Sequence, residues 1–125
     1  YMGGTTIPND VTMRFEEFII DLHSRTNVVV VNLFGGPWTR DYQAGRDYDA
    51  WVQGDLKKLL DDHEIPFFDY SQSLPASEFL DASHLSRSGR EHFTRLFMAD
   101  LKPLMERVNG TDYRRQSAPL GGQGR

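Results

Sequence analysis

An unbroken run of mostly β-branched residues, Asn27 to Leu33 (NVVVVNL), constrains the fold of this chain more than any other segment. The run is too short for most helices and apolar on both faces, a pattern typical of a central strand in a parallel sheet. A second short apolar run, Ile65 to Tyr70, predicts another strand, with Pro66 tolerable near its start. Helical spacing of apolar residues predicts helices around these strands, from Asn9-Asp10 to about Arg25, from Asp47 or Asp49 to near His63, and from about Ser86 to Val108.

The alternation of helix, strand, helix, strand and helix predicts an α/β fold, a three-layer parallel sheet with helices on both faces. A length of 125 residues favours a single domain, which we place at residues 1–108. Residues 109–125 are polar and rich in Gly, Gln and Arg, which predicts a disordered tail. In open α/β sheets the functional crevice lies beyond the carboxyl ends of the strands, so the loops after Leu33 and Tyr70 are expected to share one rim.

Composition excludes several function classes. Lys plus Arg number 14 against 18 for Asp plus Glu, a net charge of −4, and no basic run suggests nucleic acid as a partner. The absence of cysteine removes disulfides, thiolate metal sites and cysteine nucleophiles. The longest apolar run, Val28 to Val31, is far below the roughly 20 residues of a membrane span, so none is expected in this chain.

The most informative chemical motif is Asp81-Ala82-Ser83-His84, on the loop before the last predicted helix. An acid three residues before a histidine can hold one imidazole nitrogen while the other faces a cleft. The pair would supply two members of a nucleophilic triad. The structural alternative is that Asp81 or Ser83 caps a helix and that His84 is a surface side chain hydrogen-bonded to Asp81.

With these residues in view, the segment from Val28 to Leu104 resembles the C-terminal half of SGNH (GDSL-type) hydrolases and their acyltransferase relatives. The matching residues are Asp69 at a strand end, Asp81 and His84 as a D-x-x-H pair, and Leu85 and Gly89 after it. The resemblance implies a flavodoxin-like fold, with His84 as general base and Asp81 orienting the imidazole. It also points to the branch of cell-envelope polysaccharide acetyltransferases and esterases.

The chain departs from that family in its nucleophile. The family's Gly-Asp-Ser block is absent, since Gly54-Asp55 is followed by Leu56 within a predicted helix. We therefore expect the chain to be part of a longer protein whose preceding segment carries the serine. Asn9 matches the family's oxyanion-hole block in only two letters, Asn9-Asp10, and a helix cap explains it better.

The function expected from these observations is serine ester hydrolysis or O-acyl transfer, with the isolated chain inactive. The substrate would be an ester or an acylated carbohydrate, and Trp38 and Tyr42 on the predicted rim could bind it. No metal or organic cofactor is implied, because His23, His63 and His92 are scattered at spacings that form no metal site. The alternative is a non-catalytic α/β binding or assembly module. Either function leaves an apolar sheet edge open to self-association or to a partner chain.

Overall fold

The computed structural model describes residues 9–33 and 35–117, with side chains described through Gly110. The chain divides into two units, residues 1–90 and 91–125. The division falls inside the predicted single domain. The described residues of the second unit, 91–117, belong to helix α4 (Arg87–Ser117), which therefore continues beyond the predicted end at Val108. Pro103 lies inside this helix and does not end it, although proline lacks the amide proton that a helix interior uses. Residues 118–125 of the predicted tail lie outside the described residues.

The first unit begins with helix α1 (Asn9–His23), which confirms the first predicted helix. The second predicted helix forms as a helical stretch in three parts: α2 (Gln43–Trp51), the π-helical turn η2 (Val52–Leu56) and α3 (Lys57–Asp62). It starts earlier than predicted, because the 3₁₀ turn η1 (Pro37–Asp41) leads directly into it. Asp47 consequently lies inside α2 and does not cap it.

The strands are short and few. Strands β1 (Val30–Asn32) and β2 (Phe67–Asp69) pair in parallel, with Val30 opposite Phe67 and Asn32 opposite Asp69. After the 3₁₀ turn η3 (Ala76–Glu78), strands β3 (Phe79–Asp81) and β4 (His84–Leu85) form an antiparallel hairpin, which the sequence did not predict. The hairpin leads into α4.

The predicted three-layer parallel sheet with helices on both faces is wrong. The described chain is mostly helical and has two sheets of two strands each. Only three residues of the seven-residue apolar run form a strand. Two strands of this length offer too little surface to support a layer of helices on each face, so the flavodoxin-like fold implied by the family resemblance is not present.

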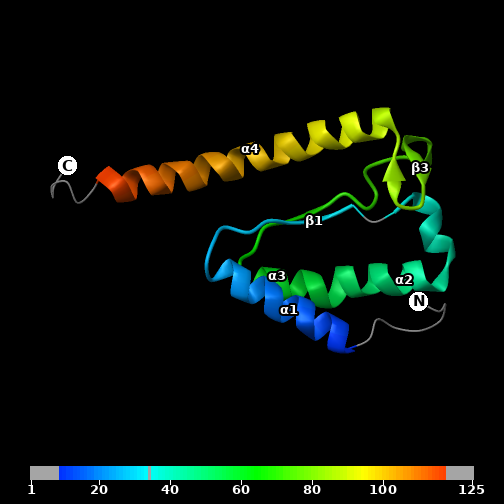
Figure 1. Ribbon diagram of the computed structural model, residues 1–125, viewed down its shortest axis with the longest axis horizontal. Coiled ribbons are helices and arrows are strands. Elements are labelled where there is room, and N and C mark those ends of the chain that lie inside the picture. Colours follow the sequence, from blue (N-terminus) through cyan, green and yellow to red (C-terminus); the bar gives the residue numbers. More distant parts are fainter. Residues whose placement is uncertain (1–8, 34, 118–125) are drawn as a thin grey trace. The chain divides into compact units, whose positions relative to one another are not determined.

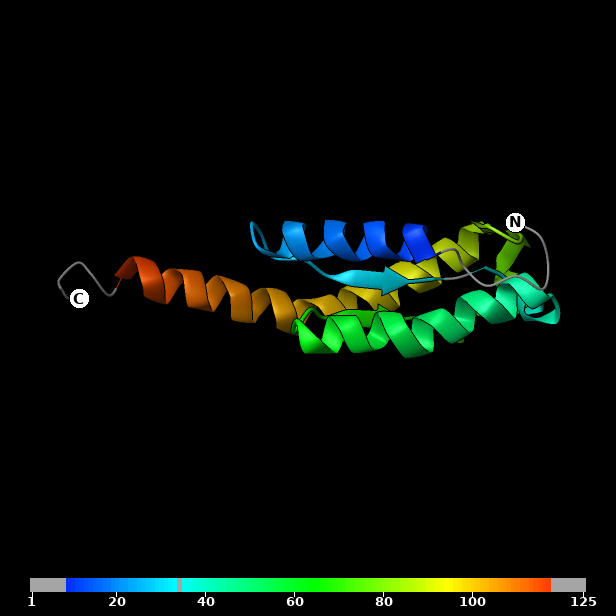
Figure 2. The same ribbon diagram turned by 90° about the horizontal axis from the view of Figure 1, so that it is seen from below.

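The core of the first unit lies between the parallel strands and the helices α1, α2 and α3. Figure 1 shows these three helices on the same side of the strands, and Figure 2, seen from below, shows β1 running between α1 and the α2–α3 stretch. Val52 and Leu60 are fully buried at the centre, and the core continues through residues of α1, η2 and the turn before β2, namely Ile19, Leu56 and Ile65. Phe15 meets Trp51 edge to face at 5.9 Å between ring centroids. None of the described helices has an apolar stretch long enough to cross a bilayer.

The turn after α3 shows how the chain enters β2. Glu64 has a positive φ of 57°, and the amide of Ile65 donates to the carbonyl of Leu60 at 2.8 Å. This is the left-handed termination that satisfies the last carbonyls of a helix. It turns the chain sharply, so that β2 runs beside β1.

Candidate active site

The Asp81 and His84 side chains meet at the turn of the β3–β4 hairpin. His84 Nδ1 lies 2.8 Å from Asp81 Oδ1 and 3.1 Å from Oδ2. A two-residue turn, Ala82-Ser83, brings the two residues opposite each other as a cross-strand pair. The pairing predicted from the D-x-x-H spacing is therefore present, although a hairpin and not a helix-entry loop creates it.

The chemistry of the two groups assigns the proton on the imidazole. An ionised carboxylate can only accept, so Nδ1 must carry the hydrogen, and in the neutral imidazole Nε2 is then the nitrogen that accepts a proton. The pKa of Asp81 is held below its ordinary value by the hydrogen bond from the Ser83 amide and then by the hydrogen bond from His84. Asp81 therefore stays ionised at neutral pH, and His84 presents a basic nitrogen away from it.

Ser83 is the nearest hydroxyl to the imidazole, but it is on the wrong nitrogen for a nucleophile. Its Oγ lies 3.2 Å from His84 Nδ1 and 3.4 Å from Asp81 Oδ1. Its amide donates to Asp81 Oδ1 at 2.9 Å, closing a turn in which an aspartate side chain accepts from the backbone two residues on. A nucleophile must share Nε2, so Ser83 is a turn residue.

Two close backbone contacts fix the turn in place. The Gly36 amide donates to the Ala82 carbonyl at 3.3 Å, and a Cβ on Gly35 would lie only 2.3 Å from that oxygen. At the other end of the hairpin, a Cβ on Gly89 would lie 2.2 Å from the Glu78 carbonyl. These glycines let the segment after β1 and the first turn of α4 approach the hairpin. Gly89, which matches the glycine of the SGNH-family run, therefore has a packing role in this chain.

Ser86 caps α4, which accounts for one of the serines near the histidine. Its Oγ accepts from the Gly89 amide at 3.0 Å, and its own amide donates to the Glu78 carbonyl at 2.8 Å. This satisfies a free amide of the first helical turn. The hairpin and the start of α4 are therefore hydrogen-bonded together.

Exposure limits what the pair can do alone. The side chains of His84 and Asp81 are 70% and 60% exposed. Water screens an exposed pair and competes for both groups, so the orienting effect of Asp81 is weaker than in an enclosed site. A catalytic site at this turn needs further groups that cover it.

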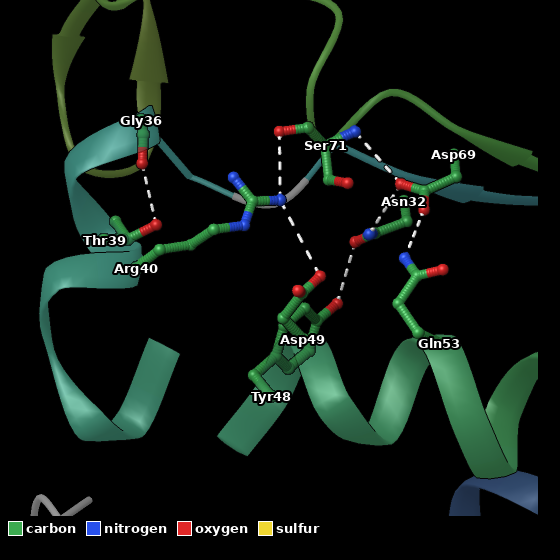
Figure 3. A network of polar contacts seen from close by, with 9 residues as sticks. All are labelled: Asn32, Gly36, Thr39, Arg40, Tyr48, Asp49, Gln53, Asp69 and Ser71. Atoms are coloured by element: carbon green, nitrogen blue, oxygen red, sulfur yellow. Dashed lines mark hydrogen bonds and ion pairs between the residues drawn. The ribbon is translucent and has the colours of Figure 1, made fainter. Parts of the chain in front are cut away.

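A second polar cluster lies where β1 and β2 end (Figure 3). Asn32, only 4% exposed, donates from Nδ2 to Asp69 Oδ1 at 3.0 Å and accepts from the Tyr48 hydroxyl at 3.0 Å. Gln53 donates to Asp69 Oδ2 at 2.6 Å, and the Ser71 amide donates to Asp69 Oδ1 at 3.0 Å. We call Asn32, Tyr48, Gln53, Asp69 and Ser71 the strand-end network.

The carboxylate of Asp69 is set by this network. Burial alone would raise its pKa, but the hydrogen bonds from Gln53, Ser71 and Asn32 outweigh burial and lower it. In the same network the pKa of Tyr48 is raised by burial and by the nearby charges of Asp69 and Asp49. The network therefore keeps an ionised aspartate and a neutral tyrosine at neutral pH.

Arg40 connects the strand-end network to the loop that holds the hairpin. Its Nη2 donates to the Ser71 carbonyl at 3.2 Å and lies 3.7 Å from Asp49 Oδ1 (Figure 3). The neighbouring Thr39 hydroxyl donates to the Gly36 carbonyl at 2.7 Å. A hollow of about 510 Å³ opens beside Arg40 between Pro37 and residues 71–75. The loops after β1 and β2 thus share a rim, as the strand order predicted.

The remaining predicted site residues are divided between this rim and other elements. Trp38 lies over Gly36 and meets Phe79 of β3 edge to face at 5.9 Å, so it packs against the hairpin. Tyr42 stands at the start of α2 with 65% exposure. Asn9 is the first residue of α1, and its carbonyl accepts from Thr12 Oγ1 at 2.9 Å. Of these three residues, only Trp38 lies at the hairpin with Asp81 and His84. Asn9 lies at the start of a helix, the position expected if it is a cap residue and not part of an oxyanion hole.

Sequence reasoning missed the strand-end network except for Asp69. The available signal was the pair of polar residues that end the two strands, Asn32 and Asp69, since parallel strands end at the same edge. Tyr48 and Gln53 were assigned no role, and their contacts could not be read from their spacing. Among the described residues, no group of three or more acidic or histidine side chains is arranged to hold a metal ion.

Comparison with known proteins adds no assignment: no family model matches the chain, and no curated protein or solved structure matches it.

Proposed function

We propose that this chain contributes the general base of a serine ester hydrolase or O-acyltransferase, with His84 as the base and Asp81 as the residue that orients it. The observation that carries the proposal is the 2.8 Å contact between His84 Nδ1 and Asp81 Oδ1, which leaves Nε2 free to accept a proton. This is the base-and-orienter half of a Ser-His-Asp arrangement.

The reaction needs a serine from a polypeptide segment other than this chain. Its Oγ would form a bond to the ester carbonyl carbon while Nε2 of His84 takes the hydroxyl proton. The carbon–oxygen bond to the leaving group would then break, and His84 would return the proton to the departing alkoxide. Water or an acceptor hydroxyl would release the acyl group in the reverse sense. An ester or an acylated carbohydrate fits this chemistry.

The exposure of the pair supports the need for that further segment. A general base works best where water is excluded and its partner is held still, and both side chains are open to solvent here. The segment that brings the serine would also cover the turn. The chain alone is then expected to show no turnover of small acyl esters above the background of a free imidazole.

The test is His84→Ala in the longest native polypeptide that contains this sequence, assayed for ester hydrolysis and acyl transfer. We expect activity to fall by roughly 10³-fold or more, since loss of a triad member removes proton transfer altogether. His63→Ala is the matched control, because His63 is an exposed histidine at the end of α3. Equal activity in both variants would contradict the proposal and favour the non-catalytic binding module.

A further inference from the structure

One edge of strand β1 carries no partner strand in the described chain. Its sheet holds only β1 and β2. Towards β2, the Val30 amide donates to the Pro66 carbonyl at 2.9 Å, and the Asn32 carbonyl accepts from the Tyr70 amide at 2.7 Å. Alternate residues of a strand direct their backbone groups to opposite edges. Residues 29, 31 and 33 therefore direct theirs to the open edge.

An apolar groove of about 630 Å³ lies along this strand. Its walls come from α1, through Val11 and Phe15, and from α2, through Tyr48 and Trp51, with Val31 of β1 between them. Figure 2 shows β1 between α1 and the α2–α3 stretch, with α1 on the side away from α3. A strand added to the open edge of β1 would thus run along α1.

The groove is uncharged and partly open to solvent. No residue that lines it carries a charge, and Val11 and Val31 are 53% and 36% exposed. An exposed apolar strand edge is a site for pairing with another strand, and native proteins usually protect it. The residues that line the groove provide no charge to protect the edge of β1, so the surface is suited to be covered by another strand.

The backbone and the walls together select the kind of occupant. A helix would fill the groove but would leave the edge amides and carbonyls of β1 without partners, at a cost for each buried group. An extended segment can bond to them and continue the β1–β2 sheet. Charged side chains would lose hydration against these walls without gaining a counter-ion.

We propose that this groove binds an extended, uncharged peptide strand, which pairs through its backbone with the open edge of β1 and packs apolar side chains beneath α1. The interaction is independent of His84 and Asp81. It makes the first unit a receptor for a β-strand, and the side chains that face Val11 and Phe15 set the preference for that strand.

The experiment measures binding of a short labelled peptide of alternating valine and threonine, with both termini capped, by fluorescence anisotropy. We expect saturable binding to the full chain. Methylation of alternate peptide amides, at unchanged charge and composition, should weaken binding roughly tenfold or more, because each methyl group removes a backbone donor. Equal affinity for both peptides would overturn strand pairing.

Two pairs of protein variants separate the edge from the walls. Val31→Pro removes the amide that faces the open edge, whereas Val31→Thr keeps it, so only the proline variant should lose binding. Val11→Lys places a charge on the groove wall, and Met13→Lys places one on α1 outside the groove, at similar exposure. Within this second pair, binding should fall for Val11→Lys and not for Met13→Lys. This result tests the groove even if the Val31→Pro variant does not fold.

Sedimentation velocity on the same samples distinguishes a second copy as the occupant. A dimer that the peptide cannot dissociate, and that Val11→Lys dissociates, would show that another copy of this chain fills the groove. That outcome would overturn the proposal. A monomer that binds the peptide supports it.

Discussion

The described part of the chain contains the same local turn at Asp69 and at Asp81, and the two copies differ in what completes them. Asp69 accepts from the Ser71 amide at 3.0 Å, and Asp81 accepts from the Ser83 amide at 2.9 Å. In both turns an aspartate side chain bonds to the backbone two residues on, and in both its pKa is lowered. What lies opposite the carboxylate decides what each turn can do.

The turn at Asp69 is completed by side-chain amides. Asn32 and Gln53 donate to its two oxygens, and neither amide can take up or release a proton. This turn fixes the ends of two strands. The turn at Asp81 is completed by an imidazole, whose ring nitrogens can both donate and accept hydrogen bonds. Under the proposed function, one motif serves structure at Asp69 and chemistry at Asp81.

The largest expected effect comes from exchanging carboxylate for amide in each turn. Asp81→Asn should lower activity of the longest native polypeptide by on the order of 10³- to 10⁴-fold, because an amide can stabilise the wrong imidazole tautomer. Asp69→Asn should leave most of the activity. The measurement is kcat on an acyl ester, together with ¹⁵N NMR of the His84 ring, which reports the tautomer directly.

The result that would break this comparison is equal loss of activity in the two variants. It would mean that Asp69 acts through the rim and that the two turns form one site. An unchanged His84 tautomer in Asp81→Asn would equally remove the role proposed for Asp81.

A smaller effect, on stability, is expected from the buried member of the strand-end network. Asn32→Ala removes the partner of both Tyr48 and Asp69 at a site that is 4% exposed. The free energy of unfolding should fall by about 1–3 kcal/mol, the cost of leaving buried polar groups unsatisfied. Urea unfolding of this chain provides the measurement.

The matched control is Gln53→Ala, which removes a donor to the same aspartate from an exposed position. Water can replace that donor, so the loss should stay below about 1 kcal/mol. A larger loss for Gln53→Ala than for Asn32→Ala would show that the network does not depend on its buried amide.

The hairpin has no buried polar side chain of its own, and its position depends on backbone approach. Gly89→Ala places a Cβ about 2.2 Å from the Glu78 carbonyl, so the first turn of α4 must move. We expect a loss of about 1–2 kcal/mol in the free energy of unfolding, as for other overpacked sites. Gly54→Ala is the control, since no atom lies within 4 Å of its Cβ, and it should gain up to about 1 kcal/mol from helix propensity. Losses of equal size would contradict the close packing at Gly89.

The sequence predicted the elements better than their assembly. Helix α1, the helical stretch around Trp51, the start of α4 and the parallel pairing of β1 with β2 follow from periodicity and from β-branched runs. The number of layers does not follow, because a seven-residue apolar run does not show that only Val30 to Asn32 pair as a strand. A fold class assigned from element order assumes that each strand meets enough others to form a layer.

The contacts of the candidate site also differ in how far the sequence could predict them. The D-x-x-H spacing was sufficient to predict contact between Asp81 and His84, because both lie in one short turn. The contacts of Tyr48 and Gln53 with the strand ends depend on how α2 and η2 pack, which no local pattern records. Local chemistry could be predicted from sequence, and chemistry between distant segments could not.

The smallest expected effect is the pH dependence of stability, and it compares the two aspartates directly. The pKa of Asp69 is lower in the folded chain than its ordinary value of 3.8, so its contribution to stability is fully present above about pH 4 and is lost as the pH falls through the lower, folded value. In Asp69→Asn, the free energy of unfolding should therefore decline less steeply below about pH 4 than in the unchanged chain. Asp81→Asn acts in the same pH range with the same sign, but water screens the exposed Asp81 carboxylate, so this variant should flatten the decline less. Urea unfolding at neutral and at acidic pH gives both differences. A greater flattening for Asp81→Asn would show that the exposed turn contributes more to acid sensitivity than the strand-end network, which would reverse the division between a structural and a chemical turn.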